Sequence, residues 1–282
     1  MLTMPQCCQR FKALRWQPSF ISPFEPLKGL SVMKIFVINL ARSPERRASM
    51  EQQLSRLNLE YEIVEAVDGS QLSYTDIMKE TRPLNYALSC GEVGCALSHI
   101  NIYRRIASEG IPMALILEDD ALIDCKTVDV MSEIEERNTT HPTVTLLTEG
   151  PKYINKPLYK SDEKKHQIYE VLEAACSHGY VINNSAACRM ANFLYSVWMV
   201  ADKWQVLKEY SVCQVEAVIP SVIGKTPHAD SSTIQFDNDF KKRLEEEKDF
   251  MWAGIKRKRP LKLKLKRLFW SSFIYPFLKI SK

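Results

Sequence analysis

The stretch MALILEDD, residues 113–120, decides the fold of this chain. Residues 113–117 form a continuous apolar run, which is typical of a strand buried on both faces of its sheet. The segment before it, 91–110, repeats apolar residues at helical spacing and ends at Gly110, after which Pro112 prevents continuation. A helix that leads directly into a buried strand predicts an α/β domain.

A second unit of the same kind lies earlier in the chain. Residues 34–40 form an apolar run rich in β-branched side chains, and a second strand is expected at 61–66. Between them, Ser43 and Pro44 are suited to begin a helix. Strand, helix and strand in succession predict an α/β fold with a central, mostly parallel sheet flanked by helices. No glycine fingerprint follows the first strand, which argues against a dinucleotide-binding oxidoreductase.

Three carboxylates, Glu118, Asp119 and Asp120, directly follow the buried strand. Like charges this close raise one another's pKa unless a cation compensates them, and ligands bind at the carboxyl edge of such sheets. Mn²⁺ or Mg²⁺ would use these oxygen ligands and bridge to phosphates. In an extended chain Glu118 and Asp120 point the same way and could share one ion, while Asp119 faces ribose or sugar hydroxyls. A solvated acidic loop is the alternative interpretation.

The composition limits the class of protein. With 282 residues, 45% of them hydrophobic and 26% charged, disordered and fibrous classes are excluded. No apolar run reaches the roughly 20 residues that span a bilayer. Eight cysteines without a CxxC pair favour reduced core thiols in the cytosol over a disulfide scaffold or a zinc site.

The net charge of +4 conceals an uneven distribution. Residues 256–282 carry ten Lys or Arg and no acid, whereas residues 33–255 carry 24 basic and 33 acidic residues. The aromatic side chains within 269–277 accompany this positive charge. Basic residues beside aromatic ones indicate contact with an anionic membrane surface. A solvated basic tail with a docking helix is the alternative, and nucleic-acid binding is disfavoured because the acidic body would oppose it.

The domain boundaries follow from these patterns. Residues 1–32 contain four prolines and no periodic apolar pattern, so we expect a non-conforming extension, with Met33 as the natural start. The catalytic domain is expected at 33–238, a charged linker helix at 239–255, and the membrane-surface tail at 256–282. The location predicted from the tail is cytoplasmic and peripheral, on the inner face of the cytoplasmic membrane.

Several segments together resemble glycosyltransferase family 25, whose members act in lipooligosaccharide and lipopolysaccharide biosynthesis. In chain order they are FVINLARSPERR (36–47), AVDG (66–69), LSCGEVGCALSHINIYRRI (88–106) and LILEDDALI (115–123), with a weaker match at HGYVINNSAACRM (178–190). The family includes bacterial β-1,4-galactosyltransferases and, more distantly, collagen galactosyltransferases. The resemblance implies a GT-A-like single domain, a UDP-sugar donor, commonly UDP-galactose, a divalent metal, and inversion at the anomeric carbon.

The same resemblance suggests roles for individual residues. Glu118, Asp119 and Asp120 match the family's acidic metal-binding motif, and His228 lies where GT-A folds often supply a further metal ligand. The residues expected to meet the nucleotide are Asn39, Leu40, Arg42 and Arg46. Either Arg46 or Arg47 could neutralise the diphosphate, and ordinary helix-surface charge is the alternative for both.

An inverting transfer also needs a base that stands apart from the metal ligands. Asp202 aligns with a family Asp, and the nearby Trp204 could stack on a sugar. A helix N-cap is the ordinary role for such an Asp, and Glu149 and Glu92 are alternative bases. His99 is either a core histidine or a site residue.

The function expected is transfer of a hexose from a UDP-sugar to a lipid-linked oligosaccharide or other surface glycan, with Mn²⁺ or Mg²⁺ as cofactor. The alternatives are a sugar-phosphate nucleotidyltransferase and a non-catalytic, membrane-bound glycan-binding or scaffold protein. The first normally needs a glycine-rich phosphate loop near the first strand, and this chain has none there.

Overall fold

The computed structural model describes residues 33–160, 166–226 and 238–282, which form one compact unit. The predicted extension at residues 1–32 and the predicted metal ligand His228 lie outside the described residues.

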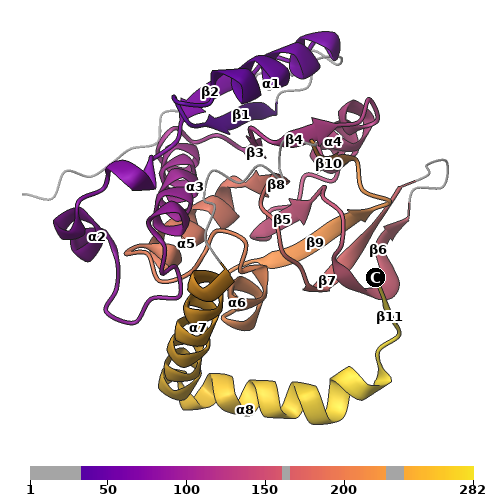
Figure 1. Ribbon diagram of the computed structural model, residues 1–282. Coiled ribbons are helices and arrows are strands. Elements are labelled where there is room, and N and C mark those ends of the chain that lie inside the picture. The colour runs from indigo at the N-terminus through magenta and orange to yellow at the C-terminus, as the bar shows by residue number, and fades with distance from the viewer. Residues whose placement is uncertain (1–32, 161–165, 227–237) are drawn as a thin grey trace, which may run out of the picture. The chain divides into compact units, whose positions relative to one another are not determined.

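A nine-stranded sheet runs through the centre of this unit in the order β11-β6-β7-β9-β5-β8-β3-β1-β2 (Figure 1). A small second sheet pairs β10 with β4 just beyond the end of β3. The strands are β1 (Lys34–Asn39), β2 (Glu62–Glu65), β3 (Met113–Glu118), β4 (Ala121–Ile123), β5 (Thr143–Leu146), β6 (Lys152–Lys160), β7 (Gln167–Glu173), β8 (Gly179–Asn183), β9 (Gln214–Ile219), β10 (Ile223–Lys225) and β11 (Ile280–Ser281).

The predicted α/β class with a central sheet is confirmed. Pairing is parallel between β2, β1 and β3 and between β5 and β9, and antiparallel at the other junctions of the large sheet. Six of its nine described strands (β2, β1, β3, β5, β9 and β6) therefore run in one direction, and β8, β7 and β11 run in the other. The carboxyl ends of β1 and β3 lie side by side as a result.

Helices cover both faces of the sheet, and alternate strand residues enter the two cores. Phe36 and Ile38 pack in one core with α3, α5 and α6, whereas Ile35 and Val37 pack in the other with α1 and α4. The helices are α1 (Pro44–Arg56), α2 (Tyr74–Glu80), α3 (Cys90–Ser108), α4 (Thr127–Glu136), α5 (Asn184–Leu194), α6 (Trp204–Glu209), α7 (Asn238–Lys258) and α8 (Leu261–Phe269), with short turns at η1 (Gly69–Gln71), η3 (Trp270–Ile274) and η4 (Tyr275–Phe277).

The C-terminal part differs in outline from the predicted linker and tail. α7 continues to Lys258, so the boundary expected between residues 255 and 256 falls inside this helix. The chain turns at Pro260 into α8, and β11 then pairs with the edge strand β6. Residues 256–282 are thus joined to the body at both ends. None of the described helices is long and apolar enough to cross a membrane.

Candidate functional site

The three carboxylates after β3 occupy a turn. Glu118 is the last residue of β3, and Asp119 and Asp120 form the turn that leads into β4. The expectation that the triplet is an extended segment with alternating side chains is therefore wrong. The chain must turn here because β4 pairs with β10 in a separate sheet. Each carboxylate consequently has its own set of neighbours.

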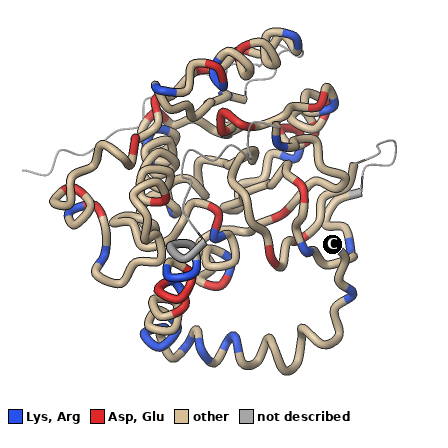
Figure 2. Tube along the Cα trace, viewed as in Figure 1, with Lys and Arg blue, Asp and Glu red and all other residues tan. Residues whose placement is uncertain are grey.

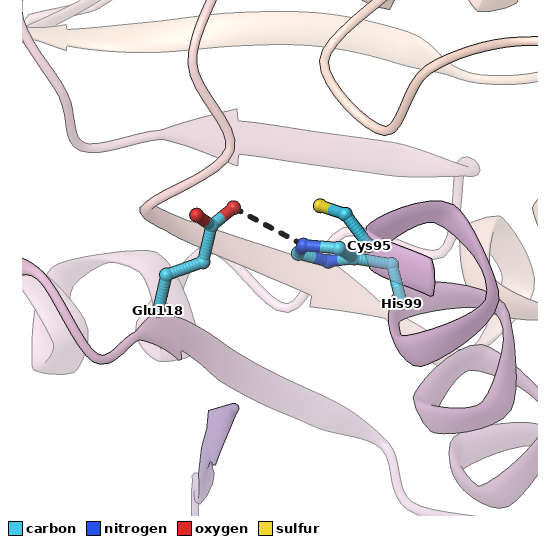
Figure 3. Close-up of side chains that lie close together, drawn as sticks. All are labelled: Cys95, His99 and Glu118. Atoms are coloured by element: carbon cyan, nitrogen blue, oxygen red, sulfur yellow. Dashed lines mark hydrogen bonds and ion pairs between the residues drawn. The ribbon is translucent and has the colours of Figure 1, made fainter. Parts of the chain in front are cut away.

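Glu118 is held by two side chains from distant parts of the chain. Its Oε1 lies 3.2 Å from Nε2 of His99 and accepts a hydrogen bond from the Ser177 hydroxyl (Figure 3). Burial alone would raise the pKa of Glu118, but these hydrogen bonds outweigh it and hold the pKa below its usual value. Glu118 is therefore a fixed anion at the end of β3.

His99 is both a core residue and a neighbour of the carboxylates. It is fully buried on α3, and its Nδ1 lies 2.7 Å from the hydroxyl of Tyr180, which lies 2.7 Å from that of Tyr103. Because the Glu118 carboxylate can only accept, a neutral His99 carries its proton on Nε2 and accepts from Tyr180 at Nδ1. The chain of hydrogen bonds then runs in one direction, from Tyr103 to Glu118.

Asp119 lies at the junction of the two parallel strands. The register places Ile38 beside Glu118, so Asn39 lies next to Asp119. The Asn39 amide donates a 2.8 Å hydrogen bond to Asp119 Oδ2, and Arg46 Nη1 lies 3.2 Å from Oδ1. Two residues predicted to meet the nucleotide are thus in direct contact with the acidic turn.

Asp120 is the carboxylate whose charge is least compensated. Its Oδ1 is buried without a hydrogen-bond partner in the described part of the chain. Burial, reinforced by the charge of Glu118, raises the pKa of Asp120 to about 6. His178 on the neighbouring loop is also buried, with neither ring nitrogen hydrogen-bonded to a described residue, and burial lowers its pKa to about 4. An orphaned oxygen next to two further acids fits a divalent cation.

A cavity of about 600 Å³, the β1 cavity, opens between the end of β1, η1 and the start of α3. Leu40, Arg42, Arg46, Glu118 and Asp119 line it, so five of the predicted site residues meet in one place. Of these, Arg42 forms a 3.0 Å ion pair with Asp68 across the cavity wall.

Arg47, the alternative to Arg46, has a different role. It forms a 2.7 Å pair with Glu51 along the exposed surface of α1 and does not line the β1 cavity. The ordinary interpretation of this residue, helix-surface charge, is therefore the one the structure favours.

The start of α3 reaches the β1 cavity because two glycines permit close packing. A Cβ at Gly69 would lie 1.9 Å from the carbonyl oxygen of Cys90, and one at Gly94 would lie 2.5 Å from that of Val67. Ser89 caps the helix and forms a capping box with its third residue. Ser89, Cys90 and Gly91 at the start of this helix line the cavity, and a helix N-terminus favours anionic groups.

A second cavity of about 660 Å³, the α7 cavity, lies beside the first. Asp202 lines it together with Lys248 of α7 and the final residue, Lys282. Cys95 lines both cavities, and Ser177, which binds Glu118, lines the second. The two cavities thus adjoin beside the acidic turn.

Asp202 is not a helix cap. The N-cap of α6 is Lys203, and the Asp202 carboxylate instead accepts a 3.1 Å hydrogen bond through Oδ2 from the backbone N–H of Cys176. Glu92 and Glu173, the other acids that line the α7 cavity, form ion pairs with Lys248 and Lys152. Among the described ion pairs that involve the cavity lining, none includes Asp202.

The remaining candidates have structural roles or lie elsewhere. Glu92 accepts from the N–H groups of Leu88 and Ser89 in the capping box of α3. Glu149 is exposed and does not line either cavity. Trp204 was expected to stack on a sugar, which is wrong, because it is buried edge-on to Tyr180 and donates to a backbone carbonyl.

Cys95, His99 and Glu118 bring potential metal-ligating atoms within 4.8 Å of one another (Figure 3). Cys95 and His99 are one turn apart on the same face of α3, opposite the end of β3. Cys95 was not among the predicted site residues. Its position four residues before His99 was the available signal. The group shares Glu118 with the acidic turn and so belongs to the same site.

Several known proteins are similar to this chain in sequence. A Drosophila melanogaster glycosyltransferase 25 family member is 39% identical over 100 residues, which cover 32% of this chain and 16% of the relative. A Mus musculus relative named as an inactive family member is 36% identical over 108 residues, 34% of this chain and 18% of the relative. Procollagen galactosyltransferase 1 of Danio rerio is 26% identical over 198 residues, 60% of this chain and 31% of the relative. The chain thus spans less than a third of each of these relatives.

Among solved structures, this chain is similar to a glycosyltransferase involved in the glycosylation of the major capsid of PBCV-1. It is 11% identical, with a TM-score of 0.37 over 69% of this chain and 94% of that one. The family model described as glycosyltransferase family 25 (LPS biosynthesis protein) matches residues 32–204, which are more than half of the chain. The chain belongs to glycosyltransferase family 25.

Proposed function

We propose that this protein transfers a hexose, with galactose the first candidate, from a UDP-sugar to a surface glycan, with inversion and with dependence on Mn²⁺ or Mg²⁺. The observation that carries the proposal is the meeting of two cavities beside one acidic turn. One cavity is lined by arginines and the start of a helix, and the other by an acid without an ion pair. Such an arrangement suits a donor and an acceptor that react at the boundary between them.

The β1 cavity has the features of a site for a nucleoside diphosphate. Arg42 and Arg46 offer planar, charged donors to phosphate oxygens, and the start of α3 adds backbone N–H groups. Both arginines are held in place by carboxylates, Asp68 and Asp119. Pre-positioned donors lower the entropy lost on binding. Asn39 supports Asp119 from behind and does not itself line the cavity.

Glu118 and Asp120 are the residues that would hold the cation, and its charge would offset that of the departing diphosphate. Asp120 supports this assignment through its orphaned, buried oxygen and raised pKa. Glu118 supports it by its firmly ionised state and its fixed orientation through His99 and Ser177. His228 stays a prediction, because it lies outside the described residues.

Asp202 is the proposed base. The oxygen of the acceptor hydroxyl attacks the anomeric carbon, its proton passes to the Asp202 carboxylate, and the bond to the UDP oxygen breaks with its electron pair. One carboxylate oxygen of Asp202 is fixed by the Cys176 N–H, which orients the other. Among the acids lining this cavity, Asp202 is the one for which no ion pair is described.

The test is an assay of the purified protein with individual UDP-sugars, Mn²⁺ and a glycan acceptor. The proposal expects transfer with release of UDP, loss of activity with a chelator, and a product of inverted anomeric configuration. Release of pyrophosphate from UTP and a sugar phosphate would instead indicate a nucleotidyltransferase. If the protein binds donors but turns over none of them, the non-catalytic interpretation is the correct one. This outcome must be tested because a relative of this chain is named inactive.

A further inference from the structure

Most of the large apolar side chains in the segment from α8 to η4 are exposed, whereas Leu263 is buried. Leu268 and Trp270 line a cavity of about 570 Å³ together with residues of β7 and α6, so they lie toward the body. Five further side chains are 57–82% exposed, and we call them the outer row: Leu261, Leu265, Phe269, Phe273 and Phe277. A soluble surface seldom keeps so many large apolar side chains together without a partner.

The orientation of this segment is fixed by ionic contacts to the body. Arg259 and Arg267 both pair with Glu209 at the end of α6, and Arg259 is buried at a distance of 2.7 Å from that carboxylate. Lys266 donates a 2.7 Å hydrogen bond to the Ser211 hydroxyl, and β11 then joins the sheet through β6. The outer row therefore faces outward as part of the fold.

Positive charge accompanies the outer row. Residues 256–282 contain ten basic residues and no acid, and Figure 2 shows the trace of α8 marked by basic positions alone. Lys262, Lys264 and Lys279 are exposed. A partner must therefore present negative charge and accept apolar side chains along one surface. The surface of an anionic phospholipid bilayer presents both, with aromatic rings at the level of the headgroups.

We propose that the outer row and its flanking lysines dock this protein on an anionic lipid surface, without crossing it. The elements on either side of this segment reach the α7 cavity, through Lys248 of α7 and Lys282 after β11. Docking therefore ties the elements that carry these two cavity residues to the lipid surface. If the proposed function holds, the acceptor is a glycan carried on an amphiphile in that surface.

Sedimentation of the full chain with vesicles tests the docking directly. We expect binding to vesicles of phosphatidylcholine with phosphatidylglycerol, weaker binding to phosphatidylcholine alone, and a decrease with added salt. The double variant Lys262→Gln/Lys279→Gln should bind about 25-fold more weakly, about fivefold for each lysine. The variant Phe269→Ala/Phe273→Ala should lose at least about tenfold.

Matched controls are Lys126→Gln, an exposed lysine just before α4, and Tyr74→Ala, an exposed aromatic residue on α2. Both lie outside the α8–η4 segment. Equal binding of all variants, or equal binding to both kinds of vesicle, would overturn the proposal. So would a concentration-dependent dimer that is abolished by Phe269→Ala/Phe273→Ala, because the outer row would then be covered by a second copy. Thermal unfolding of each variant shows that the fold is retained.

A transfer assay separates this inference from the proposed function. The Phe269→Ala/Phe273→Ala variant should keep wild-type rates with a soluble acceptor and lose about tenfold with an acceptor displayed on vesicles. Equal loss with both acceptors contradicts the docking role. Absence of transfer by the wild-type protein would defeat the proposed function, while vesicle binding would still decide the docking.

Discussion

The β1 cavity and the α7 cavity adjoin at Cys95 but are built differently. The lining of the β1 cavity comes from residues 38–119, a single run of chain that includes the end of β1, β2, β3 and the helices α1 to α3. The lining of the α7 cavity comes from residues between Tyr86 and Lys282, spread over almost the whole described chain. The first cavity is a local product of the βα units, whereas the second requires the C-terminal segment to return to the body.

The difference extends to the charged groups. In the β1 cavity each arginine has its own carboxylate, so the positive groups are positioned before any ligand arrives. In the α7 cavity Lys248 is paired with Glu92 and Lys152 with Glu173, and no described ion pair includes Asp202. We therefore expect changes near the acidic turn to affect donor and metal, and changes at Asp202 to affect only the chemical step.

The largest effect is expected at the acidic turn. Asp120→Asn removes a proposed cation ligand, and we expect transfer in Mn²⁺ to fall about a thousandfold, since such a ligand contributes several kcal/mol to the transition state. Steady-state kinetics and Mn²⁺ titration measure the loss. Asp124→Asn is the matched control, because Asp124 is an exposed acid four residues later that accepts from the Lys126 N–H. Chelator-resistant activity at the wild-type level would refute the metal assignment.

In the α7 cavity we expect a smaller loss of activity, which affects kcat and not donor binding. Asp202→Asn keeps a polar side chain that can still accept from the Cys176 N–H but cannot take up the acceptor proton. We expect kcat to fall at least about a hundredfold while UDP-sugar binding is unchanged. Glu173→Gln, on another acid of the same cavity, is the control. Near-normal turnover of the Asp202 variant would remove it as the base.

Much of the β1 cavity could be predicted from the sequence, because its signals are local. The apolar run 113–117 and the helical spacing before it predict where the strand ends. In the structure, the parallel register of β1 and β3 then brings Asn39 beside Asp119. The partners of Glu118 could not be predicted in this way. Ser177 is 59 residues away from it in the chain, and no periodicity records a contact at that separation.

The α7 cavity could be predicted only in part. Asp202 was a candidate, but an acid just before a helix has the same local pattern whether it caps the helix or faces a cavity. The interpretation of Trp204 was wrong because residues close together in a turn can point to opposite sides. Asp202 lines the α7 cavity, whereas Trp204, two residues later, is buried in the core. In residues 261–274 the composition predicts a membrane contact, but it does not predict that Leu263 is buried or that Arg267 pairs with Glu209 of the body.

A third test concerns the hydrogen bonds behind the acidic turn. Tyr180→Phe removes the donor to His99 Nδ1 and leaves the buried Tyr103 hydroxyl without its partner. We expect Mn²⁺ affinity to fall about tenfold and the free energy of unfolding to fall by about 1–2 kcal/mol. Tyr169→Phe on β7 is the control, since its hydroxyl bonds to Gln167, away from the site. Unchanged Mn²⁺ affinity with reduced stability would make the role of Tyr180 purely structural.

The smallest effect is a pH dependence of stability in the metal-free protein. Asp120 titrates near its ordinary 3.8 when unfolded and at about 6 when folded, because burial and Glu118 disfavour its charge. Between these values the folded state binds more protons, so the free energy of unfolding falls as pH rises from about 4 to about 6. We expect a loss of about 1–2 kcal/mol, less than the full linkage value because Asp120 is partly exposed.

Urea unfolding over this pH range, with and without Mn²⁺, measures the change. Asp120→Asn should abolish this component of the pH dependence and be the more stable protein above pH 6 without metal, although it is the least active. Added Mn²⁺ should restore the stability of the wild-type protein and have little effect on the variant, because a cation removes the cost of the buried charge only where the charge exists. If Mn²⁺ does not change the stability of the wild-type protein at neutral pH, the cation does not bind at Asp120. The two cavities would then differ only through the paired arginines of the β1 cavity, Arg42 and Arg46.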